Sequence, residues 1–128
     1  MGVERGGHVT DLAEIVKAYD IRGLVPDQWD EHVAAAFGSA FVSVSGVDRL
    51  VVARDMREFG VSLSRAFATA AATAGADVID AGLCSTDEMY FISGSQSVAG
   101  AMFTASHNPS GYNGIKLCLP GARPISLD

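Results

Sequence analysis

The sequence predicts an α/β layered domain, in which a mixed, mostly parallel sheet of about four strands is flanked by helices. Short apolar runs such as residues 50–53 are typical of strands that are buried on both faces. These runs alternate with longer segments of helical apolar spacing, an order that favours right-handed strand–helix–strand units. The 128 residues, 48% of them hydrophobic, suffice for one domain with a sizeable core and exclude disordered and collagen-like classes.

The first half of the chain is predicted to contain a leader, a strand and a helix. Residues 1–16 are a polar leader, and a strand at 17–21 ends at Gly23. A helix is predicted over about 28–45, because apolar residues recur every three or four positions along one face. These residues are Trp29, Val33, Phe37, Phe41 and Val44. Gly46 then ends the helix.

The second half continues the alternation of strands and helices. A helix is predicted over about 60–74, with its buried face at Val61, Phe67, Ala71 and Ala74. Ser85 or Thr86 is expected to cap a short helix that carries Met89, Phe91 and Ile92. Strands are predicted at 50–53, 78–79, 99–104 and 115–119. The short loop between the last two strands allows them to run antiparallel.

Charge and cysteine content exclude several classes of function. The chain has 9 Lys and Arg against 15 Asp and Glu, a balance that argues against broad binding of nucleic acids or anionic membranes, which need a basic face, but leaves room for a locally positive pocket. We expect neither partner, and a cytoplasmic location, because no signal peptide or membrane-spanning run is recognisable. Cys84 and Cys118 stand outside any CxxC motif and are expected to be reduced thiols.

Residues 105–114 form an unusually polar loop between the last two predicted strands. Within it, the hydroxyl of Ser106 could accept and donate a phosphoryl or acyl group, and His107 can move protons near neutral pH. Lys116 lies just beyond the loop and could meet an anion. An ordinary connecting loop explains the same composition, because loops favour these residue types.

Two further sets of polar residues follow predicted strands. Arg22 stands at the end of the first strand, where open α/β sheets bind ligands, and a guanidinium binds phosphate through two parallel hydrogen bonds. Pairing with Asp20 at the surface is the alternative. Arg54, Asp55 and Arg57 follow the next strand, where they would either support a ligand crevice from behind or form a charged helix entry.

Three motifs together indicate a family. Residues 19–23 read YDIRG, residues 104–109 read TASHNP and are continued by YNGIK at 112–116, and residues 53–57 read ARDMR. In order and spacing these stretches resemble the first domain of the α-D-phosphohexomutase family, in its phosphomannomutase/phosphoglucomutase branch, over about residues 17–125. The last motif departs from the family's GRDxR, because Ala53 replaces the glycine.

The resemblance implies a reaction that passes through a phosphoserine. Ser106 would give its phosphoryl group to a hexose phosphate, and the resulting hexose bisphosphate would return its other phosphate to Ser106. Arg22 and Lys116 would supply positive charge, and Lys116 or His107 would carry the proton. The YDIRG form of the first motif favours mannose and glucose phosphates over glucosamine phosphate.

The resemblance also implies a magnesium ion and a set of supporting residues. One ligand of Mg²⁺ would be an oxygen of the phosphate on Ser106. The residues implied to bind substrate are Tyr19, Arg22, His107 and Lys116. Arg54, Asp55 and Asn108 are implied to support these groups from behind.

Several motifs of the family's multidomain enzymes are missing from this sequence. It contains neither the aspartate-rich DGDxDR magnesium loop nor the GExSG-like sugar loop. We therefore expect residues 17–128 to be the catalytic-serine domain, with the later domains of the same chain as its partners and negligible mutase activity alone. The alternative is a stand-alone phosphate- or partner-binding module with the same fold.

Overall fold

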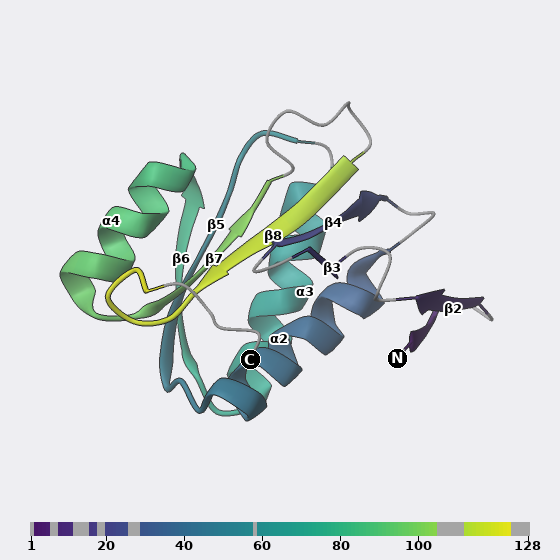
Figure 1. The fold of residues 1–128 in the computed structure, drawn as a ribbon, viewed down its shortest axis with the longest axis horizontal. Coiled ribbons are helices and arrows are strands. Elements are labelled where there is room, and N and C mark those ends of the chain that lie inside the picture. The colour runs from purple at the N-terminus through teal and green to yellow at the C-terminus, as the bar shows by residue number, and fades with distance from the viewer. Residues whose placement is uncertain are drawn as a thin grey trace.

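The computed structural model describes residues 2–5, 8–11, 16–17, 20–25, 29–57, 59–104 and 112–123. Eight strands in this part of the chain form two sheets (Figure 1). Strands β1 (Gly2–Arg5) and β2 (His8–Asp11) form an antiparallel pair. The larger sheet has the order β3 (Val16–Lys17), β4 (Asp20–Leu24), β8 (Tyr112–Cys118), β7 (Ala99–Phe103), β5 (Arg49–Arg54) and β6 (Asp77–Leu83).

The larger sheet confirms the predicted mixed α/β architecture. Strands β7, β5 and β6 are parallel neighbours, and β8 runs antiparallel to β7, as the short loop between them suggested. Strand β4 then pairs antiparallel with β8, and β3 with β4. The sheet therefore extends beyond the four strands β6, β5, β7 and β8 by two short strands at the β8 side.

Some predicted strand boundaries were wrong. The single strand predicted at 17–21 is two strands, because Lys17 pairs with Asp20 and the chain folds back on itself. The strand predicted at 78–79 extends over Asp77–Leu83, since β5 offers hydrogen-bond partners along its whole length. Strand β8 begins at Tyr112 rather than 115, so it takes up the end of the predicted polar loop. The region predicted as a polar leader contains β1 and β2, and its boundary stays a prediction.

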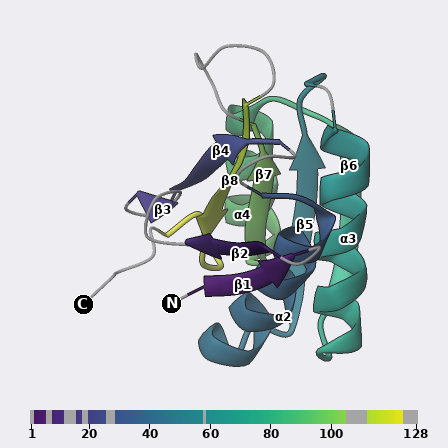
Figure 2. The ribbon, with the colours of Figure 1, turned by 90° about the vertical axis from the view of Figure 1, so that its right-hand side faces the viewer.

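In the described part of the chain, three helices cover the sheet on both faces. Helices α2 (Glu31–Ser45) and α3 (Gly60–Thr73) lie together on one face, and α4 (Thr86–Gln96) lies on the other (Figures 1 and 2). Local sequence sets their ends: the Asp30 side chain accepts from the first backbone N–H groups of α2, and Ser85 forms a capping box with Glu88 at the start of α4. No helix of the described part is long and apolar enough to span a membrane.

The buried side chains form one cluster on each face of the sheet. Alternate residues of β5 point to opposite sides, so Leu50 and Val52 pack with α2 and α3, whereas Val51 and Ala53 pack with α4. This two-sided burial explains the uninterrupted apolar run of β5. The larger cluster is centred on Trp29, Phe67 and Phe103, and the smaller on Met89 and Met102.

The helix faces were predicted correctly in part. Trp29, Val33 and Phe41 are buried in or before α2, and Phe37 packs against them, but Val44 is 88% exposed. In α3 the buried face is Leu63, Phe67 and Ala71, and the predicted Val61 and Ala74 are exposed. Val61 precedes Leu63 by two positions, which is about half a helical turn and points it away from the sheet. Phe91, two positions after Met89, is exposed for the same reason.

Candidate active site

The carboxyl ends of β5 and β7 meet at one edge of the sheet. These strands are parallel neighbours, Arg54 pairs with Phe103, and the backbone N–H of Asp55 donates to the carbonyl of Phe103 at 3.1 Å. The next residue, Thr104, donates its backbone N–H to the carbonyl of Gly114 in β8 at 2.9 Å. Two polar side chains, those of Asp55 and Thr104, are thereby placed side by side.

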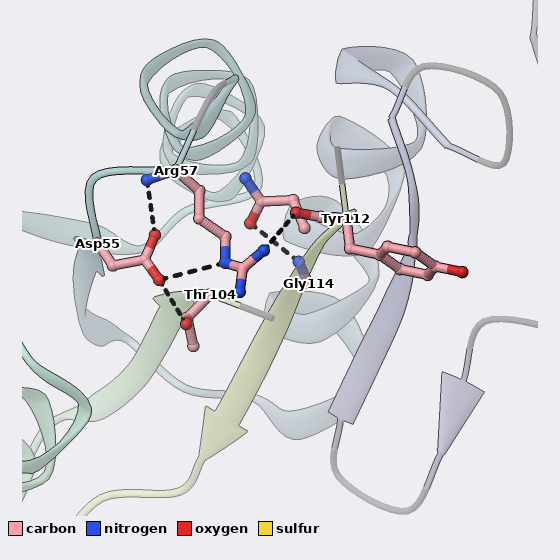
Figure 3. A network of polar contacts seen from close by, with 6 residues as sticks. Asp55, Arg57, Thr104, Tyr112 and Gly114 are labelled. Atoms are coloured by element: carbon pink, nitrogen blue, oxygen red, sulfur yellow. Dashed lines mark hydrogen bonds and ion pairs between the residues drawn. The ribbon is translucent and has the colours of Figure 1, made fainter. Parts of the chain in front are cut away.

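The Asp55 carboxylate connects these strand ends to the turn that follows β5 (Figure 3). Its Oδ2 accepts a hydrogen bond from Thr104 Oγ1 at 2.6 Å, and its Oδ1 accepts from the backbone N–H of Arg57 at 3.0 Å. The guanidinium of Arg57 returns to the same carboxylate, with Nε 3.7 Å from Oδ2. Such charge-assisted bonds are among the stronger ones in proteins.

Arg57 also contacts the first residue of β8. Its Nη1 donates to the carbonyl oxygen of Tyr112 at 3.4 Å. The Tyr112 ring is directed away from the network (Figure 3). Beside it, Asn113 is fully buried, and its Oδ1 accepts from the backbone N–H of Gly114 at 2.9 Å. The start of β8 is thus held by both backbone and side-chain contacts.

The contacts among Asp55, Arg57, Thr104 and the Tyr112 carbonyl are called the clamp below. Thr104 is the last described residue before segment 105–111, and Tyr112 is the first after it. The clamp therefore joins the two ends of the segment that contains Ser106. Sequence reasoning did not foresee these links, although Asp55 lies just after one predicted strand and Thr104 ends another.

The structure describes only some of the predicted site residues. Tyr19, Ser106, His107 and Asn108 lie outside the described residues, and their roles stay predictions. Arg22 lies within β4 rather than at its end, and its backbone pairs with Gly114, the residue that also pairs with Thr104. Three neighbouring strands thus bring Arg22, Gly114 and Thr104 into one row.

Lys116 and Arg54 occupy different surroundings. Lys116 is half-buried in β8, between Asp20 of β4 and Met102 of β7, and two residues along the strand place it about 7 Å from Gly114. Arg54 lines a cavity of about 150 Å³ with Arg65 of α3, on the other side of the strand from Asp55. Its role in supporting the site from behind stays a prediction.

The described residues contain no metal-binding cluster. Across those ranges, His, Cys, Asp and Glu side chains nowhere gather in a group of three or more that could hold an ion. Asp55 is the only carboxylate of the clamp, and Thr104 and Arg57 already bind both of its oxygens. This donor set does not fit a divalent cation, which takes several oxygen ligands.

The fold and the site define a class of protein. It is an α/β/α domain in which Thr104, the last described residue before segment 105–111, lies where the parallel strands β5 and β7 end, the edge at which such domains bind ligands. A sequence model described as "Phosphoglucomutase/phosphomannomutase, alpha/beta/alpha domain I" matches residues 13–128. The chain belongs to this family and corresponds to its domain I, which confirms the resemblance seen in the motifs.

Individual relatives agree with this assignment. The chain is 44% identical over 113 residues to phosphohexose mutases of Xanthomonas campestris, covering 88% of this chain and 25% of that protein. It is 42% identical to a phosphomannomutase of Klebsiella pneumoniae, of which it covers 72%. A solved phosphoglucomutase/phosphomannomutase family protein from Burkholderia thailandensis superposes with a TM-score of 0.75 at 38% identity, over 84% of this chain and 26% of that one. The chain spans about a quarter of the Xanthomonas and Burkholderia proteins.

Proposed function

We propose that this chain is the catalytic-serine domain of a phosphohexomutase that interconverts hexose 1-phosphates and hexose 6-phosphates, with mannose or glucose as the sugar. One observation carries the proposal. Within a domain I of this family, segment 105–111, which carries Ser106, follows Thr104 at the carboxyl end of β7 and beside the end of β5, and the clamp joins the two residues that flank this segment, Thr104 and Tyr112. The names of the relatives, phosphohexose mutase and phosphomannomutase, support the same reaction.

The proposed reaction moves a phosphoryl group twice. Phosphorylated Ser106 transfers its phosphoryl group to the free hydroxyl of a hexose monophosphate: the Ser106 oxygen–phosphorus bond breaks, a sugar oxygen–phosphorus bond forms, and Lys116 or His107 carries the sugar hydroxyl proton to the released Ser106 oxygen. The bisphosphate then turns around, its other sugar oxygen–phosphorus bond breaks as the phosphoryl group returns to Ser106, and the serine proton is carried back to the released sugar oxygen. Phosphoryl transfer depends mainly on alignment and charge neutralisation, which Arg22 and Lys116 supply in this proposal.

The remaining groups complete the proposed site. Tyr19 lines the substrate cleft, and Asn108 and Asp55 support the reacting groups from behind. A magnesium ion, bound by the phosphate of Ser106, also belongs to the proposal. The described residues offer no set of ligands for Mg²⁺, so the proposed roles of Arg22, Lys116 and His107 are stated without the ion.

The test uses a hybrid in which this chain replaces the matching quarter of the Xanthomonas campestris phosphohexose mutase. Turnover of glucose 1-phosphate and mannose 1-phosphate is measured with a bisphosphate primer, and intact mass reports phosphate on Ser106. We expect the hybrid to be active and Ser106→Ala to reduce turnover to background, whereas Ser110→Ala, in the same loop, retains it. The 128-residue chain alone should show no turnover.

Two outcomes would overturn the proposed function. One is a folded hybrid without turnover or serine phosphate, a result that would favour a stand-alone binding module. The other is a Ser106→Ala variant that turns over as fast as its parent. Circular dichroism of each protein establishes that it is folded.

A further inference from the structure

We infer that Asp55 and Arg57 are positioning residues, which act on the reaction by fixing the distance between the two ends of segment 105–111. The inference rests on the proposed function, because it gives Ser106 the reacting oxygen. Neither residue is proposed to contact the substrate. In this proposal the ARDMR motif holds the two residues that flank segment 105–111, Thr104 and Tyr112, at a set distance from each other.

The beginning of the segment is fixed by the Asp55 carboxylate. Thr104 is 5% exposed, and its hydroxyl donates to Asp55 Oδ2 at 2.6 Å while its backbone N–H donates to Gly114. Asp55 is itself held, because its backbone N–H bonds to Phe103 and its Oδ1 accepts from the N–H of Arg57. Both the backbone and the side chain of Thr104 are therefore restrained.

The end of the segment is fixed by Arg57. Its guanidinium lies 3.7 Å from Asp55 Oδ2 through Nε and 3.4 Å from the Tyr112 carbonyl through Nη1. The planar guanidinium has donors in fixed directions, so one side chain can bind both groups at once. A lysine ammonium has no such fork and would satisfy one partner at the cost of the other.

These contacts are better suited to placement than to stability. The Arg57 and Asp55 side chains are 18% and 29% exposed, and ion pairs that water reaches contribute little to folding. Phosphoryl transfer, in contrast, is sensitive to the position of the reacting oxygen, and a displacement of about 1 Å can reduce the rate on the order of 100-fold. Releasing one end of a loop that carries this oxygen is expected to produce such a displacement.

The experiment measures kcat and KM in the hybrid defined above. Three variants open the clamp at different bonds: Asp55→Asn, Arg57→Lys and Thr104→Val. We expect kcat to fall about 10- to 100-fold with KM changed less than about twofold, while intact mass still detects phosphate on Ser106. Thr104→Ser keeps the hydroxyl and should retain the parent kcat.

Two controls separate placement from general damage. Arg49→Ala removes an exposed arginine at the opposite end of β5 and should leave kcat unchanged. The double variant Asp55→Asn/Arg57→Lys should have about the same kcat as the slower of the two single variants. The reason is that the effects of substitutions on kcat do not add when the residues act as one unit. Thermal melts ensure that each variant is assayed well below its unfolding temperature.

The inference and the proposed function fail in different ways. If the three clamp variants keep the parent kcat while Ser106→Ala is inactive, the positioning role is wrong and the proposed function stands. A loss of kcat that Thr104→Ser shares with Thr104→Val also overturns the inference, because the hydroxyl would then not be responsible. Activity that survives Ser106→Ala overturns the proposed function itself.

Discussion

The two ends of the β7–β8 pair are built differently. At the end remote from the clamp, Ser93 of α4 is fully buried and binds several groups at once. Its hydroxyl donates to the Val98 carbonyl at 2.6 Å and accepts from the Ala122 N–H at 3.0 Å and the Cys118 thiol at 3.3 Å. Its own carbonyl accepts from the N–H groups of Val98 and Gly121. This region is called the Ser93 end.

At the clamp end the charged side chains that link the strands are partly exposed, although Thr104 and Asn113 are buried. Asp55 and Arg57 are 29% and 18% exposed, so water reaches both side chains, whereas Ser93 is fully buried. Loss of a partner costs much folding free energy when the polar group left behind is buried. A partly exposed group can form a hydrogen bond to water instead, so its loss of a partner costs less. We therefore expect the loss of a contact of Asp55 or Arg57 to cost less stability than the loss of the contacts of Ser93, so the charged side chains of the clamp end can be tuned for the site at a small cost in folding.

The largest effect on stability is expected from Gly100→Ala in β7. A Cβ at Gly100 would overlap with Sδ of Met89 and lie 3.0 Å from Sγ of Cys118, and both neighbours are buried. Overpacking of this kind should cost about 3 kcal/mol of unfolding free energy, measured by urea denaturation of the 128-residue chain.

Gly94→Ala provides the matched control for Gly100→Ala. A Cβ at Gly94 of α4 would meet nothing within 4 Å, so this variant should be more stable than the parent by about 0.5 kcal/mol. If Gly100→Ala unfolds at the same urea concentration as the parent, the Ser93 end is not tightly packed and the comparison fails.

The next largest effect is expected from Ser93→Ala. It leaves the Val98 carbonyl without its hydroxyl donor and the Ala122 N–H without its acceptor, in a buried position, so the cost should be about 2 kcal/mol by the same measurement. Ser95→Ala, on the exposed side of the same helix, should change stability by less than about 0.5 kcal/mol. Equal values for the two variants would contradict the role given to Ser93.

The sequence alone predicted those features whose causes are local. The spacing from Trp29 to Phe41 predicted α2, and Ser85 was one of the two residues expected to cap α4, because caps and helical faces depend on neighbouring residues. Val44 and Val61 were assigned to the buried face but are exposed, since an apolar side chain does not itself reveal which way its helix turns.

Features that depend on distant partners were not predictable in this way. The fold-back at Lys17 and Asp20 is completed by the pairing of β4 with β8, nearly a hundred positions later in the chain. Likewise, Thr104 and Asp55 are 49 positions apart, and they meet because β7 lies beside β5 although β6 precedes it in the chain. The motifs indicated which residues are important, and only the strand order shows that they form a clamp.

The smallest expected effect concerns the two cysteines, one at each end of the sheet. Cys84 follows β6 near the clamp end, where its N–H bonds to the Arg54 carbonyl, and Cys118 contacts Ser93. Burial raises the pKa of both thiols above the ordinary value of about 9.0, with Glu88 and Asp80 adding to the effect at Cys84. Folding therefore favours the neutral thiols.

The sign of the pH dependence follows from these raised values. Their contribution to stability is complete below about pH 9 and is lost as the pH rises through the folded-state pKa, so unfolding free energy should decline slightly above pH 9. Alkylation by iodoacetamide, followed by peptide mass spectrometry, should be slow at pH 7 and accelerate for the half-buried Cys84 as the pH rises. The buried Cys118 should react only as the chain unfolds; if it reacts as fast as Cys84 in the folded chain, the Ser93 end opens as readily as the clamp end.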